Sequence, residues 1–267
     1  MIDVILVGAL GKMGREIAKL ILASDEFRII WAKEKEKHQD LGKDIGELVG
    51  GKKMGVRVEA VFPQASEKSV VIDFSTPAST IEAFEFALSN GLPFLSGTTG
   101  LKPEDIEKFK QGAQKIPVLY SSNMSPGMNL IFGLAGELAR YLNGRADIEI
   151  VEYHHRQKAD SPSGTALRLA EIIAEAQKST LDNLAVFGRF GKNCLRKDKE
   201  IGIHSVRAGQ IPGSHEILFA LPFENITITH EVLSRSVFAA GALEAAKFIF
   251  NASPGFYSTK EIFSLSR

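Results

Sequence analysis

Short apolar runs alternate with helix-like segments along the first 125 residues. The runs end in turns rich in Gly, Ser or Thr, and the segments after them place apolar residues three and four positions apart. Regular alternation of strand and helix is typical of a parallel sheet with helices on both faces. The strands predicted in this way cover residues 4–7, 28–32, 70–74, 93–96 and 118–120.

The pattern changes after residue 125. A helix over about 129–141 is expected to bridge two domains, and the later strands are joined by turns rather than by helices, which favours a mixed or antiparallel sheet. A final apolar helix over 237–249 is expected to pack back on the first domain. We therefore predict one domain from residues 1–125 together with 238–267, and a second domain from residues 126–237. The remaining segments of the second domain are predicted as strands at 148–153, 219–222 and 225–230, with a polar loop at 206–213.

Composition narrows the function class. The 267 residues carry 32 basic and 32 acidic side chains, so no overall field attracts nucleic acid or an anionic membrane. The one cysteine, Cys194, excludes an internal disulfide framework and favours a reducing compartment. Met1 leads directly into a strand, without the charged and apolar regions of a targeting segment, so we expect a cytoplasmic protein with no membrane association.

A glycine-rich turn follows the first strand. Gly8, Gly11 and Gly14 permit a tight bend and let backbone N–H groups approach a pyrophosphate at the start of a helix. Glu34 ends the second strand twenty residues after Gly14, where an acidic side chain meets the adenosine ribose hydroxyls. The spacing is G-x-x-G-x-x-G rather than G-x-G-x-x-G, and the charged run 33–37 also fits a solvated loop. Together the features predict a Rossmann dinucleotide-binding domain.

The cofactor is predicted to be NADH, NADPH or both. Glu34 favours NADH through its acceptor oxygens, whereas Lys35, helped by Lys12, can neutralise a 2′-phosphate. The carboxyl ends of parallel strands gather along one edge of a sheet, so the turns after the later strands should line the nicotinamide end. The predicted cofactor-binding residues are Gly8, Gly11, Lys12, Met13, Gly14, Glu34, Lys35, Phe74, Ser75, Gly97, Thr98, Thr99, Ser122, Asn123 and Met124.

The run from His154 to Thr165 concentrates further chemistry. It combines two imidazoles and a lysine with a Ser-Gly-Thr turn at a predicted helix start, which suits a small dianion that must receive a proton. Taken singly, such histidines are also common on solvated surfaces, and such turns commonly only cap helices. Metal binding is disfavoured because adjacent histidines on a strand point to opposite faces, and no cysteine or carboxylate cluster supplies the other ligands.

These motifs occur in a fixed order over almost the whole chain, and in this respect the sequence resembles the 4-hydroxy-tetrahydrodipicolinate reductase (dihydrodipicolinate reductase) family. The motifs that carry the resemblance are the turn from Gly8 to Arg15, Asp73-Phe74-Ser75, Gly97-Thr98-Thr99-Gly100, Asn123-Met124-Ser125, the run from His154 to Thr165, and Val206-Arg207-Ala208-Gly209. The resemblance implies an NAD(P)H-dependent reductase of diaminopimelate and lysine biosynthesis. It further implies a homotetramer of two-domain subunits, with the C-terminal segment completing the Rossmann domain.

The resemblance also assigns roles to residues. His154 corresponds to the proton donor and Lys158 to the second catalytic residue, while the substrate-binding positions are His155, Lys158, Ser163, Gly164 and Thr165. The implied substrate is a small dicarboxylate. Two other classes stay open on the residues alone: an amino-acid dehydrogenase of related two-domain design, and a nucleotide sensor without catalysis.

Overall fold

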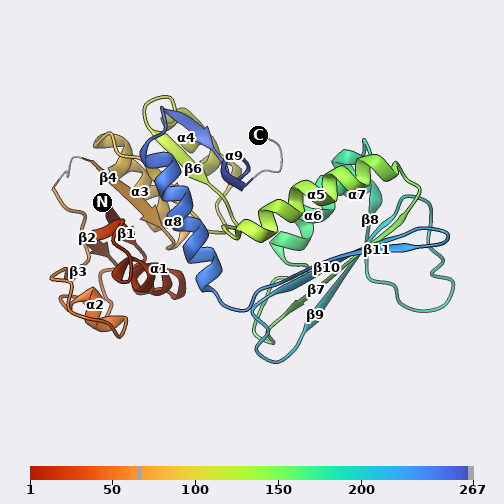
Figure 1. The fold of residues 1–267 in the computed structure, drawn as a ribbon, viewed down its shortest axis with the longest axis horizontal. Helices are drawn as coiled ribbons and strands as arrows, with labels where there is room; N and C mark the ends of the chain where they lie inside the picture. Colours follow the sequence, from red (N-terminus) through yellow and green to blue (C-terminus); the bar gives the residue numbers. More distant parts are fainter. Residues whose placement is uncertain (65–67, 264–267) are drawn as a thin grey trace. The chain divides into compact units, whose positions relative to one another are not determined.

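The computed structural model describes residues 1–64 and 68–263, which form two compact units (Figure 1). The first unit contains Met1–Pro126 and Arg235–Phe263, and the second contains Gly127–Ser234. The four C-terminal positions that the sequence assigns to the first domain, 264–267, lie outside the described residues. None of the helices within the described ranges has the length and apolar composition that a membrane crossing demands.

A seven-stranded sheet in which every pairing is parallel forms the centre of the first unit. The strand order is β12-β6-β5-β4-β1-β2-β3. The strands are β1 (Ile2–Val7), β2 (Phe27–Lys33), β3 (Val58–Glu59), β4 (Ser69–Asp73), β5 (Phe94–Ser96), β6 (Pro117–Tyr120) and β12 (Gly255–Tyr257). The helices are α1 (Lys12–Leu22), α2 (Ile45–Leu48), α3 (Pro77–Ser89), α4 (Pro103–Gly112), α8 (Ser236–Phe250) and α9 (Lys260–Phe263).

Both faces of this sheet are covered. On β4, Val70 and Ile72 pack in one hydrophobic cluster with residues of α1 and α8, whereas Val71 packs in another with residues of α3 and α4. Successive side chains of a strand point to opposite faces, so a strand buried on both sides is mostly apolar, and in β4 the polar residues Ser69 and Asp73 stand at its two ends. This explains the unbroken apolar runs that predict the parallel sheet.

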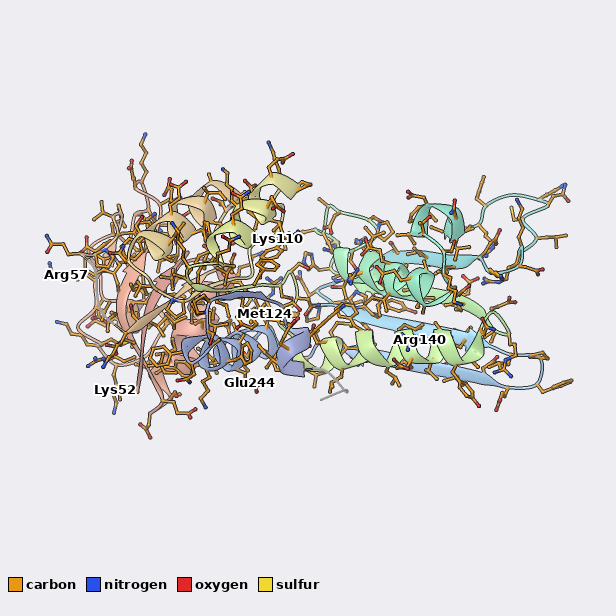
Figure 2. All side chains as sticks on the ribbon, turned by 90° about the horizontal axis from the view of Figure 1, so that it is seen from above. Lys52, Arg57, Lys110, Met124, Arg140 and Glu244 are labelled. Atoms are coloured by element: carbon orange, nitrogen blue, oxygen red, sulfur yellow. The ribbon has the colours of Figure 1, made fainter. Side chains whose placement is uncertain are left out.

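The C-terminal segment completes the first unit. Helix α8 packs against α1 and β4, and β12 adds an edge strand beside β6. A Cβ on Gly241 would lie 1.8 Å from the carbonyl oxygen of Met124, so only glycine allows α8 to approach the segment after β6 this closely. Met124 itself, labelled in Figure 2, is 1% exposed and belongs to the core.

The second unit is a five-stranded mixed sheet with helices on one face. Strand β7 pairs antiparallel with β10 and parallel with β9, in the order β11-β10-β7-β9-β8. The elements are α5 (Pro126–Leu142), β7 (Asp147–His154), α6 (Gly164–Ala176), α7 (Leu181–Leu184), β8 (Ala185–Phe187), β9 (Ile201–Arg207), β10 (Ser214–Ala220) and β11 (Asn225–Glu231). The predicted fold class, a Rossmann domain followed by an α+β domain with a mixed sheet, is confirmed.

Several local predictions are wrong; the strand predicted at 219–222, for example, is only the end of β10, which runs over Ser214–Ala220. The helix expected to bridge the domains lies in the second unit from Gly127 onward, because Met128, Ala135 and Ala139 pack into the core of that unit. Arg207 is not in a polar loop but is the last residue of β9, paired with His154 of β7. The apolar part of β9 is short, so the polar residues that follow conceal the strand.

Candidate active site

The glycine turn brings three backbone segments into close contact. Gly8 has φ +73°, and a Cβ there would lie 2.4 Å from the carbonyl oxygen of Phe74. A Cβ on Gly14 would lie 2.1 Å from the carbonyl oxygen of Gly8. A side chain at either position would require the backbone to move, so these glycines are needed for the close packing of β1, α1 and the turn after β4.

The start of α1 suits an anionic group. Gly11 is the N-cap residue and provides no side-chain acceptor, and the first turn of the helix carries no acidic residue. The first N–H groups of a helix have no partner within it, and the helix dipole makes this end positive. Lys12 is exposed here and Met13 is half-buried. The arrangement fits the pyrophosphate of a dinucleotide.

Glu34 is held beside the same turn. Its Oε2 accepts a hydrogen bond from the N–H of Leu10 at 3.0 Å, and its Oε1 accepts one from the N–H of Lys35 at 3.0 Å. The half-buried carboxylate therefore has a fixed position next to the glycine turn, while Lys35 is exposed. The residues present fit a nicotinamide dinucleotide.

Asp73, which the sequence analysis does not assign to the site, connects two of the predicted turns. Its fully buried carboxylate accepts hydrogen bonds from the hydroxyls of Ser75, Thr80, Ser96 and Thr98. Thr98 Oγ1 also accepts the N–H of Ser75 at 2.9 Å. Burial raises the pKa of Asp73, against the hydroxyl hydrogen bonds that lower it. An acidic residue at the end of an otherwise apolar strand is the signal that could have identified this position.

The other predicted residues of this edge differ in exposure. The ring of Phe74 packs over Gly97, where a Cβ would lie 2.1 Å from Cε1. Thr99 and Ser122 are exposed and Asn123 is half-buried. The carbonyl of Asn123 accepts a hydrogen bond from Ser121 Oγ at 2.9 Å.

In the second unit, β7 places Glu152 and His154 on the face covered by helices. Buried and partly exposed residues alternate along the strand, and Glu152 is 0% exposed. Nδ1 of His154 lies 2.6 Å from Oε2 of Glu152. Burial lowers the pKa of His154, and the charges of Lys158 and Arg207 add to this, whereas Glu152 opposes the shift.

Lys158 and the start of α6 complete the cluster. Lys158 Nζ lies 2.8 Å from both carboxylate oxygens of Asp160, a pair with an exposed acid that a substrate carboxylate can displace. Ser163 is the N-cap of α6, and its Oγ accepts the N–H of Ala166 at 3.2 Å. The Ser163 side chain is thus used inside the protein, while Gly164 is exposed and Thr165 half-buried in the first turn.

Two further histidines lie near this cluster. His215 Nε2 is 3.0 Å from Ser163 Oγ, and burial lowers the pKa of His215 to about 3, so it is neutral over the working range. His215 is not among the residues predicted from the sequence, although its place among the apolar residues of β10 is a signal for it. Nδ1 of His155, a predicted substrate-binding residue, is buried without a hydrogen-bond partner. Within the described residues no group of three or more His, Cys, Asp or Glu is arranged to hold a metal.

The first unit is a parallel sheet with helices on both faces and a glycine turn at a helix start that has no side-chain cap. The second unit contains a mixed sheet and a buried carboxylate–histidine pair. Together these are the architecture of a two-domain nicotinamide-dependent oxidoreductase. Family models described as dihydrodipicolinate reductase, N-terminus, and dihydrodipicolinate reductase, C-terminus, match residues 2–124 and 127–263. The chain belongs to the dihydrodipicolinate reductase family. The predicted family and enzyme class, an NAD(P)H-dependent oxidoreductase, are confirmed.

Similar proteins cover the chain from end to end. The 4-hydroxy-tetrahydrodipicolinate reductase of Rubrobacter xylanophilus is 40% identical and that of Magnetococcus marinus 39%, covering 100% and 98% of both chains respectively. A solved structure described as dipicolinate-bound dihydrodipicolinate reductase from Paenisporosarcina sp. TG-14 has a TM-score of 0.74 at 24% identity, covering 98% of this chain and 99% of that one. This last similarity supports the fold.

Proposed function

We propose that the protein reduces 4-hydroxy-tetrahydrodipicolinate to tetrahydrodipicolinate with NADH or NADPH, in the diaminopimelate and lysine pathway. Relatives of that name, matched over their full length, support the reaction. The structural observation that carries the proposal is the His154–Glu152 pair, buried at the end of β7 beside Lys158 and the start of α6. The cluster offers a proton donor beside groups that attract carboxylates.

Each residue has a part in the chemistry. When bound, the nicotinamide would supply a hydride for one carbon of the unsaturated ring that the substrate forms when its hydroxyl leaves as water. His154 gives a proton to the neighbouring carbon, so that hydride and proton together saturate the double bond. Lys158 and the backbone N–H groups of Gly164 and Thr165 hold the carboxylates and stabilise developing negative charge. His155 and Ser163 line the region that holds the carboxylates and keep its residues in position.

The choice of cofactor is proposed to depend on Glu34 and Lys35. The fixed carboxylate of Glu34 accepts hydrogen bonds from ribose hydroxyls, which favours NADH. Exposed Lys35 and Lys12 supply positive charge for a 2′-phosphate, so both cofactors should be used. In Lys35→Ala the affinity for NADPH should fall relative to that for NADH; an unchanged ratio would remove Lys35 from this role.

We also propose a cytoplasmic homotetramer assembled through the second unit. Large apolar side chains are exposed there, including Phe187, Phe190 and Phe223. Where exposed apolar side chains form a contiguous patch, they mark a contact with another protein surface. Sedimentation analysis of the full chain should give a mass four times that of the subunit, and fractionation of the source cells should place it with cytoplasmic enzymes. A monomer at micromolar concentration would refute the assembly.

The test of the reaction is the loss of nicotinamide absorbance with substrate generated by the preceding synthase. Wild-type protein should oxidise NADH or NADPH only when substrate is present. His154→Gln and Lys158→Ala should each lower turnover by about a hundredfold or more while cofactor binding persists. Full activity in both variants would contradict the assigned roles. No activity with either cofactor, but activity with an amino acid and NAD⁺, would favour an amino-acid dehydrogenase, and binding without any turnover would favour a sensor.

A further inference from the structure

One buried carboxylate contacts both parts of the proposed substrate site. Oε2 of Glu152 meets Nδ1 of His154 at 2.6 Å, and its Oε1 accepts the N–H of Ser163 at 3.0 Å. Arg207 donates from Nη1 to Oε2 and from Nη2 to Oε1, each at 2.7 Å. Glu152 therefore links the proposed proton donor to the turn that opens α6.

The charge of Glu152 determines the tautomer of His154. Burial alone would raise the pKa of Glu152, but hydrogen bonds from Arg207, His154 and Ser163 among others lower it to about 2. An ionised carboxylate can only accept hydrogen bonds, so Nδ1 of His154 must carry the hydrogen. Nε2 is then the nitrogen that gains or gives up the reacting proton.

Arg207 acts inside the protein rather than on a substrate. Besides Glu152, its guanidinium donates to the carbonyl of Val206 at 2.9 Å and to the carbonyl of Asp160 at 2.7 Å. A bidentate guanidinium fixes the plane of a carboxylate as well as its charge. The side chain thereby holds Glu152 in the orientation that serves both His154 and Ser163.

Two positive charges near His154 oppose its protonation: Arg207, which faces it from β9, and Lys158, from the turn after β7. The neutral ring of His215 on β10 also faces it, with ring centroids 5.3 Å apart. The carboxylate of Glu152 is the acidic group bonded directly to the ring, and it favours the charged imidazolium. Its removal should make His154 harder to protonate.

We infer that Glu152 is a positioning residue for the reduction: it fixes the tautomer of His154, supports the protonated ring and anchors the turn at Ser163. The inference rests on the proposed function for the part that His154 plays in the reaction. The tautomer and the anchored turn do not depend on it. This allows the two ideas to be tested separately.

The first measurement needs no substrate. In full-length protein with ¹⁵N-labelled histidine, the His154 signals, identified by their loss in His154→Gln, should show hydrogen on Nδ1 in the neutral ring. Glu152→Gln should shift the ring to a mixture of tautomers. The matched control is Glu149→Gln, because Glu149 lies on the same strand and its Oε2 is 2.6 Å from His204 Nε2, but it is on the other face of the sheet. A wild-type ring with hydrogen on Nε2 would overturn the inference without any Glu152 variant.

The second measurement is the pH dependence of turnover. If protonated His154 is the donor, kcat falls as pH rises through its pKa, and in Glu152→Gln this fall should move to lower pH by about one unit or more. The KM for substrate should rise while the KM for cofactor stays within about twofold, since the turn at Ser163 loses its anchor. Glu152→Asp, which keeps the charge, should retain more of the wild-type profile, and it replaces Glu152→Gln if that variant does not fold.

The outcomes separate the two proposals. Wild-type inactivity counts against the proposed function, and a fully active His154→Gln counts against the part that His154 plays in it; either result leaves the NMR measurement to decide whether Glu152 fixes the tautomer. An active wild type whose tautomer and pH profile are both unchanged in Glu152→Gln would refute the positioning role and leave the proposed function standing.

Discussion

A Cβ on Gly213 would lie 3.1 Å from Nε2 of His154. This is the nitrogen that we propose exchanges the reacting proton, so the residue opposite must be small. In Gly213→Ala the added methyl should displace the ring by a few tenths of an ångström, and the φ of +158° strains any side chain at this position; kcat should fall by about tenfold, with cofactor binding unchanged. The control is Gly127→Ala, where the new Cβ would meet the His230 ring at 3.4 Å, an ordinary contact. If both variants have the kcat of the wild-type protein, Nε2 does not exchange the reacting proton on the side of the ring that Gly213 faces.

The pair of Arg207 and Glu152 should matter for stability as well as for placement. Arg207→Met leaves a carboxylate that is 0% exposed without its main charged partner, which should cost about 3–5 kcal/mol. The double variant Glu152→Gln with Arg207→Met removes both charges and should regain part of this loss. Hydrogen exchange of β7 and β9 measures the effect locally, because the one tryptophan, Trp31, lies in the first unit. Equal losses in the single and double variants would contradict the argument.

The local structure around the glycine turn is easier to predict from the sequence than the contacts of Glu152, and the reason is physical. The strand, glycine turn and helix around Gly8 are local, so their residue pattern shows the whole arrangement. The partners of Glu152 are Ser163 and Arg207, 11 and 55 positions away, brought together only by the sheet register and the start of α6. The sequence around Arg207 does not show which residue its guanidinium contacts, so the sequence alone suggests a positively charged residue in a loop.

His215 should make stability depend on pH. Its pKa is lowered to about 3 in the folded protein by burial first, and then by the nearby His154, so the folded ring stays neutral where an unfolded histidine is protonated. A lowered folded pKa gives stability that is complete above about pH 6.5 and is lost as pH falls toward 3. Within this pH window, unfolding of the wild-type protein should take up about one more proton than unfolding of the His215→Gln variant. Glutamine is chosen because its amide can still contact Ser163. Urea denaturation of both proteins at several pH values measures this uptake; identical slopes against pH would show that His215 is not buried as a neutral ring.

Asp73 should decide whether the turns after β4 and β5 hold their shape. In Asp73→Ala the hydroxyls of Thr80, Ser96 and Thr98 lose their buried acceptor, so we expect the first unit to be destabilised by about 3 kcal/mol or more and cofactor affinity to fall. Asp73→Asn should be milder, because one amide oxygen still accepts and no buried charge has to be desolvated.

The readouts for Asp73 are Trp31 fluorescence during urea denaturation and NADH titration of the folded protein. Asp3→Ala is the control: this aspartate on β1 pairs with the exposed Arg28 at 2.9 Å, and such surface pairs contribute little to stability. Because the hydroxyls of Ser75 and Thr98, two predicted cofactor-binding residues, both donate to Asp73, loss of stability in Asp73→Ala should be accompanied by weaker cofactor binding. A destabilised variant that still binds NADH with wild-type affinity would confine Asp73 to the core and separate it from the site.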